Sequence, residues 1–494
     1  MPDPARPRQL SKSRFTAGLQ CPKLLWWKVH EPEAPELVPD PAQQALFDQG
    51  TRVGVVARDY VPGGVLVDLP HYAHRERVEA TRQAMATDVA AIYEAGVMGG
   101  GVFAAVDILE RSEWGWRVVE VKSTTSVKEE HLPDLAVQVY AARAQGIAVV
   151  GAEVMHLNRA CRHPDLSNLF ARNDRLEAVG ELLPKIPELV DGQLAMLQGP
   201  LPEVPTGLHC HAPYSCPFLG RCWPEPPLHH ISTLNGVGPQ KTADWEDKGV
   251  TTIFDLPPDA KLNPVQARQR RAVCEDRIIV EPGLREALLV FDTDAAFLDF
   301  ETIKPAIPVW PGCRPYDQVP VQVSVHRLMP GMSAVHYPFL ADGPGDPREA
   351  VAHAVIAACR GAAVVIAWNA SFERTALKTL GEASPHLAAE LQTVIDRLID
   401  PMPVVRAHVC HPAFGGSFSL KAVLPILAPE LVYDDLAIQD GDSAARELER
   451  LILSGDGIPL EERACLRRDL LAYCERDTWG MAVVLDRLRA LAEA

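Results

Sequence analysis

Four cysteines have a type and spacing that suit metal binding. Cys21 lies within the helix-like N-terminal segment SKSRFTAGLQCPKLLWW, and Cys210, Cys216 and Cys222 lie together in HCHAPYSCPFLGRCWP. Soft thiolates gathered in this way bind an iron–sulfur cluster or a tetrahedral zinc ion. Bound metal would join the two ends of one domain, so we call these four residues the cysteine clasp. The alternative is that they are ordinary buried cysteines of a core.

Residues inside the bracketed segment suit metal-dependent hydrolysis. The sequence GGGVFAAVDILERSEWGWRVVEVKSTT predicts two strands of alternating apolar residues joined by a turn at Trp114–Trp116. Glu120 and Lys122 share one face of the second strand, and Asp107 is expected at the end of the first strand, facing the same site. Two carboxylates can hold a divalent cation, and the ammonium can offset charge that develops on a phosphate.

Asp107, Glu120 and Lys122 resemble the motif of the PD-(D/E)XK nuclease superfamily. The cysteine clasp resembles that of its RecB-like iron–sulfur branch, which includes AddB and the CRISPR-associated RecB-like exonucleases. This resemblance implies a restriction-endonuclease-like α/β core, a [4Fe-4S] cluster on the clasp, and Mg²⁺ or Mn²⁺ on the two carboxylates. The segment DLAVQVYAARAQG is similar to the glutamine–tyrosine helix of that branch, which implies a catalytic role for Gln138.

Two positions depart from that pattern. Tyr140 follows Gln138 by two residues where the branch has four, and Gly54 stands where many relatives have a metal-binding histidine. For the clasp, zinc remains the alternative metal, bound by Cys210, Cys216 and Cys222 with either Cys21 or His211.

The segment after the clasp resembles a helix-hairpin-helix module. In LNGVGPQKTADWEDKGV, a turn with Gly236 and Gly238 precedes a predicted helix, whose N-terminal N–H groups can hold a nucleic-acid phosphate. The alternative is a packing element between domains. In the next helix, Arg268, Arg270 and Arg271 could contact a DNA backbone, but a solvated helix face is the favoured interpretation.

A second acidic set begins in AAFLDFETIKP, where Asp299 and Glu301 share one face of a predicted strand. Burying two neighbouring carboxylates is costly unless a cation compensates them. Near the C-terminus, Tyr473 and Asp477 share a helix face at spacing i, i+4. Between these segments, AAVVIAWNASFERTALKTL predicts a strand, a loop and a helix that carries Glu373.

In order and type, these three segments resemble the motifs of DnaQ-like DEDD exonucleases, which have an RNase H-like fold. The resemblance implies that Asp299, Glu301, Glu373 and Asp477 bind two divalent cations and that Tyr473 positions the attacking water. Glu373 stands where the family has aspartate. In GGSFSLKAVLPIL, Ser419 and Lys421 could meet substrate phosphate, but capping of a helix by Ser419 is favoured.

Length and composition predict an α/β multidomain protein. We expect a RecB-like domain at 1–228, a small helical hairpin module at 229–262, a helical linker at 263–290 and a DnaQ-like domain at 291–494. The net charge of −17 argues against a protein that coats nucleic acid nonspecifically. No apolar stretch has the length of a signal peptide core or a membrane span, so a cytoplasmic protein without membrane partners is expected.

This domain order resembles a group of bacterial RecB-like nucleases. The sequence predicts a metal-dependent exodeoxyribonuclease that acts on single strands or strand ends in repair, recombination or defence, with a helicase or repair protein as partner. Two alternatives stay open. One is a nucleic-acid-binding scaffold with decayed sites, and the other is a DNA-binding protein regulated by the redox state of an iron–sulfur cluster.

Overall fold

The computed structural model describes residues 9–329, 331–454 and 457–493. The chain forms two compact mixed α/β units: the first contains Met1–Glu225 and Ala306–Tyr316, and the second contains Pro226–Pro305 and Asp317–Ala494. The segments expected as hairpin module and linker thus belong to the second unit. Residues Ala306–Tyr316, which interrupt the second unit in the sequence, belong to the first.

A mixed sheet forms the centre of the first unit. Its strands follow the order β2 (Gly64–Leu66), β3 (Ala91–Gly99), β4 (Val102–Ser112), β5 (Gly115–Lys122), β6 (Val149–Leu157) and β7 (Phe170–Asp174), and β1 (Leu10–Ser11) pairs with β4. The hairpin of β4 and β5 is antiparallel, whereas β5 and β6 are parallel and are connected through helix α5 (His131–Ala144). The predicted pair of strands is therefore present.

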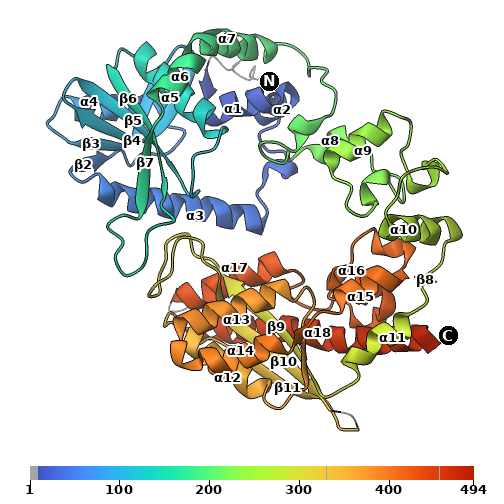
Figure 1. Ribbon diagram of the computed structural model, residues 1–494. Helices are drawn as coiled ribbons and strands as arrows, with labels where there is room; N and C mark the ends of the chain where they lie inside the picture. Colours follow the sequence, from blue (N-terminus) through green and yellow to red (C-terminus); the bar gives the residue numbers. More distant parts are fainter. Residues whose placement is uncertain (1–8, 330, 455–456, 494) are drawn as a thin grey trace. The chain divides into compact units, whose positions relative to one another are not determined.

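Helices cover both faces of this sheet (Figure 1). Leu135 and Val139 of α5 join the larger core with Val106 and Val118. On the other face, Ala57 at the end of α3 (Pro41–Ala57) packs in a separate cluster with Tyr93, Ile108 and Val119. The first unit also contains helices α4 (His74–Met85), α6 (Leu176–Leu182) and α7 (Ile186–Met196).

The N-terminal segment forms two helices, where the sequence suggested one. Helix α1 (Lys12–Gln20) begins at the cap Ser11, whose hydroxyl accepts a hydrogen bond from the N–H of Arg14 at 3.2 Å. Helix α2 (Pro22–His30) follows after Cys21, whose backbone is extended. A residue before proline is pushed out of the helical region, so the chain breaks at Cys21.

Residues 306–316 connect two strands of the second unit but pack within the first. Ala306 lies in a cluster with Val53, Leu157 and Leu169. The Gln49 amide donates to the Tyr316 hydroxyl at 2.7 Å, and that hydroxyl in turn donates to the carbonyl of Ser123. This segment therefore contacts the chain directly after Lys122.

A five-stranded sheet forms the centre of the second unit. Its order is β11 (Val335–Leu340), β10 (Val319–Leu328), β9 (Ala295–Ile303), β12 (Val364–Ile366) and β13 (Leu398–Ile399). Helices α12 (Arg348–Ala358), α13 (Ser371–Ala383) and α14 (Ala388–Asp396) cover one face, while α17 (Gly441–Leu453) and α18 (Leu460–Glu493) lie against the other (Figure 1). Alternation along β9 sends Leu298 and Phe300 into the α12–α14 core, and Asp299 and Glu301 to the side of α18.

The remaining part of the second unit contains short elements: α9 (Pro239–Glu246), α10 (Pro264–Glu275), β8 (Ile279–Val280), α11 (Leu284–Leu288), α15 (Met402–His408), β14 (Val409–Cys410) and α16 (Leu420–Leu427). Strand β8 pairs with β14. A small core holds this region together, with Ile231, Leu234, Ile253 and Val273 among its members.

The arginines of α10 all contact protein groups, so the expected solvated face is wrong for Arg268, whereas Arg271 is exposed and contact with DNA stays a prediction. Arg268 is buried and donates to the Glu281 carboxylate at 3.2 Å and to the carbonyl of Arg406 at 2.8 Å. Arg270 donates to the carbonyls of Leu256 and Pro257, and Arg271 pairs with Glu281 at 2.7 Å. The solvated face was a sound interpretation of sequence alone, but the carbonyls that these side chains bind are distant in sequence or belong to loops.

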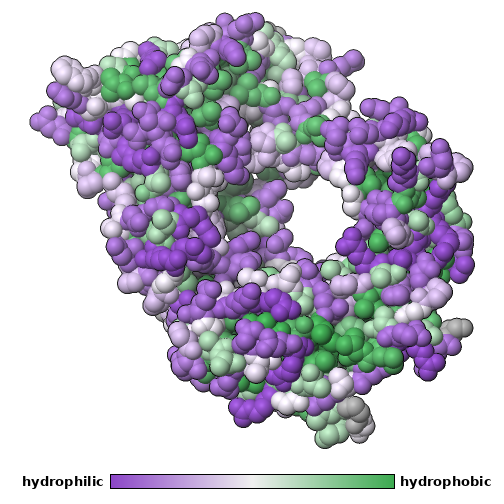
Figure 2. Space-filling view, in the orientation of Figure 1, coloured by the Kyte–Doolittle hydropathy of each residue, from purple (hydrophilic) through white to green (hydrophobic). Residues whose placement is uncertain are grey.

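Figure 2 shows hydrophilic residues over most of the visible face of each unit, with smaller apolar areas among them. Among the described residues, no helix combines the length and the apolar character that a membrane span requires.

Candidate functional sites

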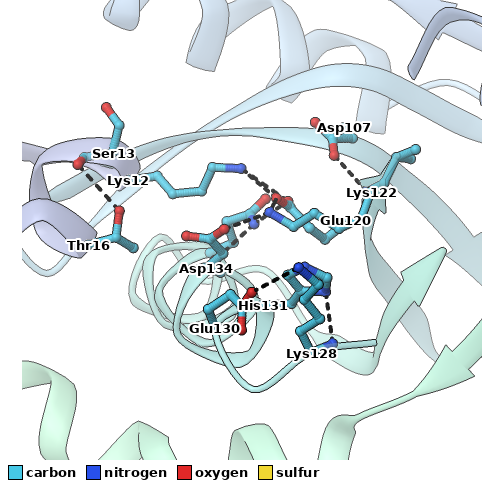
Figure 3. A network of polar contacts seen from close by, with 12 residues as sticks. Lys12, Ser13, Thr16, Asp107, Glu120, Lys122, Lys128, Glu130, His131 and Asp134 are labelled. Atoms are coloured by element: carbon cyan, nitrogen blue, oxygen red, sulfur yellow. Dashed lines mark hydrogen bonds and ion pairs between the residues drawn. The ribbon is translucent and has the colours of Figure 1, made fainter. Parts of the chain in front are cut away.

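Glu120 lies at the centre of the first candidate site, surrounded by hydrogen-bond donors. The ammonium of Lys12 lies 2.9 and 3.1 Å from its two oxygens, and that of Lys122 lies 2.9 Å from Oε1 (Figure 3). The Gln138 amide donates to Oε2 at 2.6 Å. Lys122 also pairs with Asp134 at 2.6 Å. Strand β5 and helices α1 and α5 thus bring Glu120, Lys122 and Gln138 together with two residues that the sequence did not indicate.

Asp107 lies in the middle of β4, not at the end of the strand as expected. Its Oδ2 accepts a hydrogen bond from the N–H of Val121 at 2.7 Å. The facing position of β3 is Glu94, whose φ of 55° is in the left-handed region. Such a conformation is strained for glutamate and is typical of functional sites. Arg58 and Arg77 hold the Glu94 carboxylate at 3.2 and 3.6 Å.

Lysine side chains of the first site offset the charge of its carboxylates. Burial and the neighbouring Glu120 raise the pKa of Asp107 to about 7. Burial also acts to raise the pKa of Glu120, but the ammonium groups of Lys12 and Lys122 outweigh it and hold this pKa below its usual range. For Lys122, Glu120 and Asp134 outweigh burial and raise the pKa. Glu120 is therefore ionised and Lys122 is charged at neutral pH.

Lys12, Asp134 and Glu94 were missed in the sequence. Glu94 had the clearest signal, because it is the single acidic residue in the apolar run AIYEAGV. Lys12 is 108 residues from Glu120, and nothing local marks that contact. The two positions that depart from the RecB-like pattern are Tyr140 and Gly54. The Tyr140 hydroxyl donates to the carbonyl of Gly100, and a side chain at Gly54 would meet open space.

The cysteine clasp is gathered at the end of α1. Cys21 and Cys216 are buried in one cluster with Leu24, Trp27 and Phe218, and Cys222 packs against it. Burial raises the pKa of the Cys216 thiol, and the neighbouring Cys21, Cys210 and Cys222 add to this effect. The Gln20 amide donates to the carbonyls of His209 and Tyr214 at 2.9 and 2.7 Å, so α1 is fixed to the loop that carries Cys210 and Cys216.

The spacing of the clasp thiols bears on which metal could bind them. Zinc–sulfur bonds of about 2.3 Å place the sulfur atoms of a tetrahedral site about 3.8 Å apart. Within the described part of the chain, three sets of residues have ligand atoms within 4.8 Å of one another, and the clasp is not among them. Thiolates bind both iron–sulfur clusters and zinc, so the donor set suits either metal group.

The second candidate site combines carboxylates from β9, α13 and α18. Asp299 and Glu301 come from β9, Asp477 and Tyr473 from α18, and Glu373 from the first turn of α13. Glu373 is 3% exposed, and its Oε2 is buried without a hydrogen-bond partner. The thiol of Cys474 donates to Asp299 at 3.4 Å.

The pKa values of these carboxylates are all raised. Burial is the largest cause at each, and repulsion among the carboxylates adds to it at Asp299 and Glu301. The pKa rises to about 8 at Glu301 and Glu373 and to about 6 at Asp477, where Tyr433 and Lys421 partly offset burial. The Glu373 charge raises the pKa of both Asp299 and Glu301, so it lies close to them. A divalent cation would relieve both burial and repulsion.

Three further residues support the second site. The Tyr433 hydroxyl donates to Asp477, and the Lys421 ammonium donates to the Tyr473 hydroxyl at 2.7 Å. Asp400 accepts from the N–H groups of Asn369 and Ala370 at the start of α13. Tyr433 and Asp400 were missed, because each lies in a short loop without periodicity.

Ser419 is the N-cap residue of α16, but its hydroxyl makes no capping bond. That hydroxyl instead accepts a hydrogen bond from the Ser417 hydroxyl at 3.1 Å. The expectation of side-chain capping was therefore wrong, because a local turn at Ser417 competes for the same group.

The predicted hairpin glycines lie beside a groove within the second unit. Gly236 has a φ of 70°, and Gly238 precedes α9 as its N-cap. The groove, about 430 Å³, is lined by residues 232–237 and 415–418 together with Met402 and Arg406. The side-chain amide of Asn235 donates to the carbonyl of Gly416 at 2.8 Å, which joins the two loops.

The comparisons with known proteins match one part of the chain. Residues 296–419 are similar to a family described as a domain of unknown function, DUF2779. A search of curated proteins gave no match. The matched segment begins on β9 and contains Asp299, Glu301 and Glu373, but it ends before Lys421 and α18.

Proposed function

We propose that this protein is a metal-dependent nuclease that hydrolyses DNA phosphodiester bonds at two centres, one in each unit. The observation that carries the proposal is the gathering of the half-buried Asp299 and Glu301 with the buried Glu373 and Asp477, with an oxygen of Glu373 left without a partner. Carboxylates gathered in this way need a cation, and Mg²⁺ and Mn²⁺ prefer oxygen ligands.

The first centre is proposed as a RecB-like site on a restriction-endonuclease-like core. Asp107 and Glu120 would hold one divalent cation, which supplies Lewis acidity and makes water a better nucleophile. Lys122, fixed by Glu120 and Asp134, keeps a positive charge beside the reacting phosphate. Gln138 holds the second oxygen of Glu120 in place. Water adds to phosphorus, and the bond between phosphorus and the leaving oxygen breaks.

The second centre is proposed as a DnaQ-like site on an RNase H-like fold. Its four carboxylates would hold a pair of divalent cations. Tyr473, held by Lys421, is placed to orient the attacking water toward the phosphate of a strand end. The segment Gly415–Lys421 connects the groove beside Gly236 with this site, which supports a strand-binding role for that groove. Trimming of 3′ ends is the proposed reaction.

The cysteine clasp is proposed to hold a [4Fe-4S] cluster that stabilises the first unit. Protein purified without oxygen should be brown and contain about four iron atoms per chain. The variant Cys216→Ser should lose the colour. A colourless protein with one zinc ion would show that the clasp is a zinc site.

The nuclease proposal is tested with 5′-labelled and 3′-labelled single strands in Mn²⁺. Glu120→Gln should abolish one product pattern and Asp299→Asn the other, each by more than about 100-fold. The double variant should be inactive. Wild-type protein that binds DNA but releases no product would instead favour a scaffold with decayed sites, and DNA affinity that changes with reversible oxidation would favour a redox-regulated binder.

A further inference from the structure

The proposed reaction at the first centre assigns no role to the ammonium group of Lys12. Lys12 contacts both oxygens of Glu120, at 2.9 and 3.1 Å, and its side chain is 25% exposed. A divalent cation bound to Glu120 needs at least one of these oxygens at about 2.1 Å. The ammonium and the divalent cation therefore compete for the same carboxylate.

Lys12 is also connected to the cysteine clasp by one short helix. It is the first residue of α1, and Gln20 is the last, followed directly by Cys21. Gln20 fixes that end of α1 to the carbonyls of His209 and Tyr214. At the other end, the hydroxyl of Ser11 caps the helix, and β1 pairs with β4, the strand of Asp107. Figure 3 shows the Lys12 side chain reaching from α1 to Glu120.

We propose that Lys12 is a positioning residue that occupies Glu120 until a divalent cation displaces it, and that the cysteine clasp holds Lys12 there through α1. The inference rests on the proposed function of the first centre and on the metal proposed for the clasp. A clasp that holds its metal keeps α1 in place and so keeps the ammonium on Glu120. A clasp that has lost its metal releases the end of α1, and the competition for Glu120 weakens.

The test measures Mn²⁺ affinity of the full chain by calorimetry and electron paramagnetic resonance. Asp299→Asn and Asp477→Asn are present throughout, so that the second centre does not contribute. Lys12→Met should tighten Mn²⁺ binding about five- to tenfold, because a competing charge is removed. Lys12→Arg should restore the original affinity. The matched control is Lys128→Met, since Lys128 pairs with Glu130 at 3.4 Å and is half exposed.

The clasp is tested in the same background with Cys21→Ser and with Gln20→Ala, which keeps all four cysteines. Each should tighten Mn²⁺ binding when Lys12 is present and leave it unchanged in Lys12→Met, even where the melting temperature falls in both. Weaker Mn²⁺ binding in Lys12→Met would show that Lys12 only supports Glu120 and would overturn the inference. An equal shift with and without Lys12 would overturn the link to the clasp.

Failure of the proposed function gives a different result. If Glu120→Gln leaves the Mn²⁺ binding of this background unchanged, Glu120 is not a metal ligand and the first centre itself is wrong. If Glu120→Gln abolishes binding while Lys12→Met has no effect, the centre stands and only the role of Lys12 fails.

Discussion

The two acidic sites of this chain neutralise their charge in opposite ways. At the first site, Lys12 and Lys122 contact Glu120 directly, and the pKa of Glu120 is held below its usual range. At the second site, Lys421 donates to a tyrosine hydroxyl, and the pKa values of Glu301 and Glu373 rise to about 8. Without metal, lysine side chains offset the carboxylate charge of the first site, whereas the carboxyl groups of the second site stay protonated and so avoid that charge.

This difference teaches that buried carboxylates alone do not define how strongly a site needs metal. The first site can fold around its lysines, so divalent cations there compete with protein charges. The second site has fewer internal cations and an unpartnered oxygen at Glu373, so a divalent cation replaces protons. The following predictions test this contrast.

The largest expected effect is on the pH dependence of Mn²⁺ binding. Ligation at the second site displaces protons from Glu301 and Glu373, and also from Asp299, whose pKa is raised too, so affinity should rise at least about 100-fold per pH unit below pH 8. Of the two proposed carboxylate ligands of the first site, only Asp107, with a pKa of about 7, keeps a proton near neutral pH. Affinity there should rise about tenfold per pH unit below pH 7. Calorimetry measures how Mn²⁺ affinity changes with pH at the first site in Asp299→Asn and at the second site in Glu120→Gln. An equal pH dependence in the two variants would contradict the proposed difference between the sites.

Metal-free stability should also depend on pH more steeply in the second unit. A raised carboxyl pKa means that the native state keeps protons which the unfolded state has lost, so the free energy of unfolding falls as pH rises. Each such group contributes about 1.4 kcal/mol per pH unit. Glu301 and Glu373 act between about pH 4.5 and 8, whereas in the first unit Asp107 is the one described carboxyl group with a raised pKa, and it acts up to about pH 7.

The lowered pKa of Glu120 has the opposite sign. Its stabilisation is complete above the usual glutamate pKa and is lost only as pH falls below about 4.5. In chelator, raising the pH from 5 to 8 should therefore lower the melting temperature of the second unit more than that of the first. Thermal unfolding measures both transitions. A second transition that does not move with pH would argue against protonated carboxylates at that site.

A smaller effect is expected for Glu373→Gln. Metal-free protein should be stabilised by about 2 kcal/mol at pH 9, because an ionised oxygen without a partner is removed. The rise in melting temperature with Mn²⁺ should shrink in the same variant. Glu382→Gln, on the exposed side of α13, is the matched control and should change neither quantity. Destabilisation of Glu373→Gln without metal would mean that its carboxylate has a partner.

The sequence predicted the elements that carry strong periodicity. Strand β9, the helix with Tyr473 and Asp477, and the hairpin of β4 and β5 all follow from alternating or helical patterns. The same patterns placed Glu120 beside Lys122, because residues two apart share a strand face. They could not give Lys12, which reaches Glu120 across 108 residues. The contact depends on how α1 packs, and no local pattern encodes that.

Other differences arise where tertiary contacts override local rules. Arg268 looked solvated because it lies in a polar helix, yet Glu281 and a distant carbonyl bind it. Asp107 was expected at the end of its strand, whereas β4 continues past it to Ser112. The left-handed Glu94 opposite Asp107 reflects the strain of building that site and has no signature beyond one charge in an apolar run.

The most direct test of two independent centres is the number of Mn²⁺ ions bound by the full chain at pH 8, counted by electron paramagnetic resonance. Wild-type protein should bind ions of two classes, Glu120→Gln should lose the class of the first site alone, and Asp299→Asn that of the second alone. Loss of all Mn²⁺ binding from one substitution in folded protein, or unchanged binding in both variants, would contradict the account.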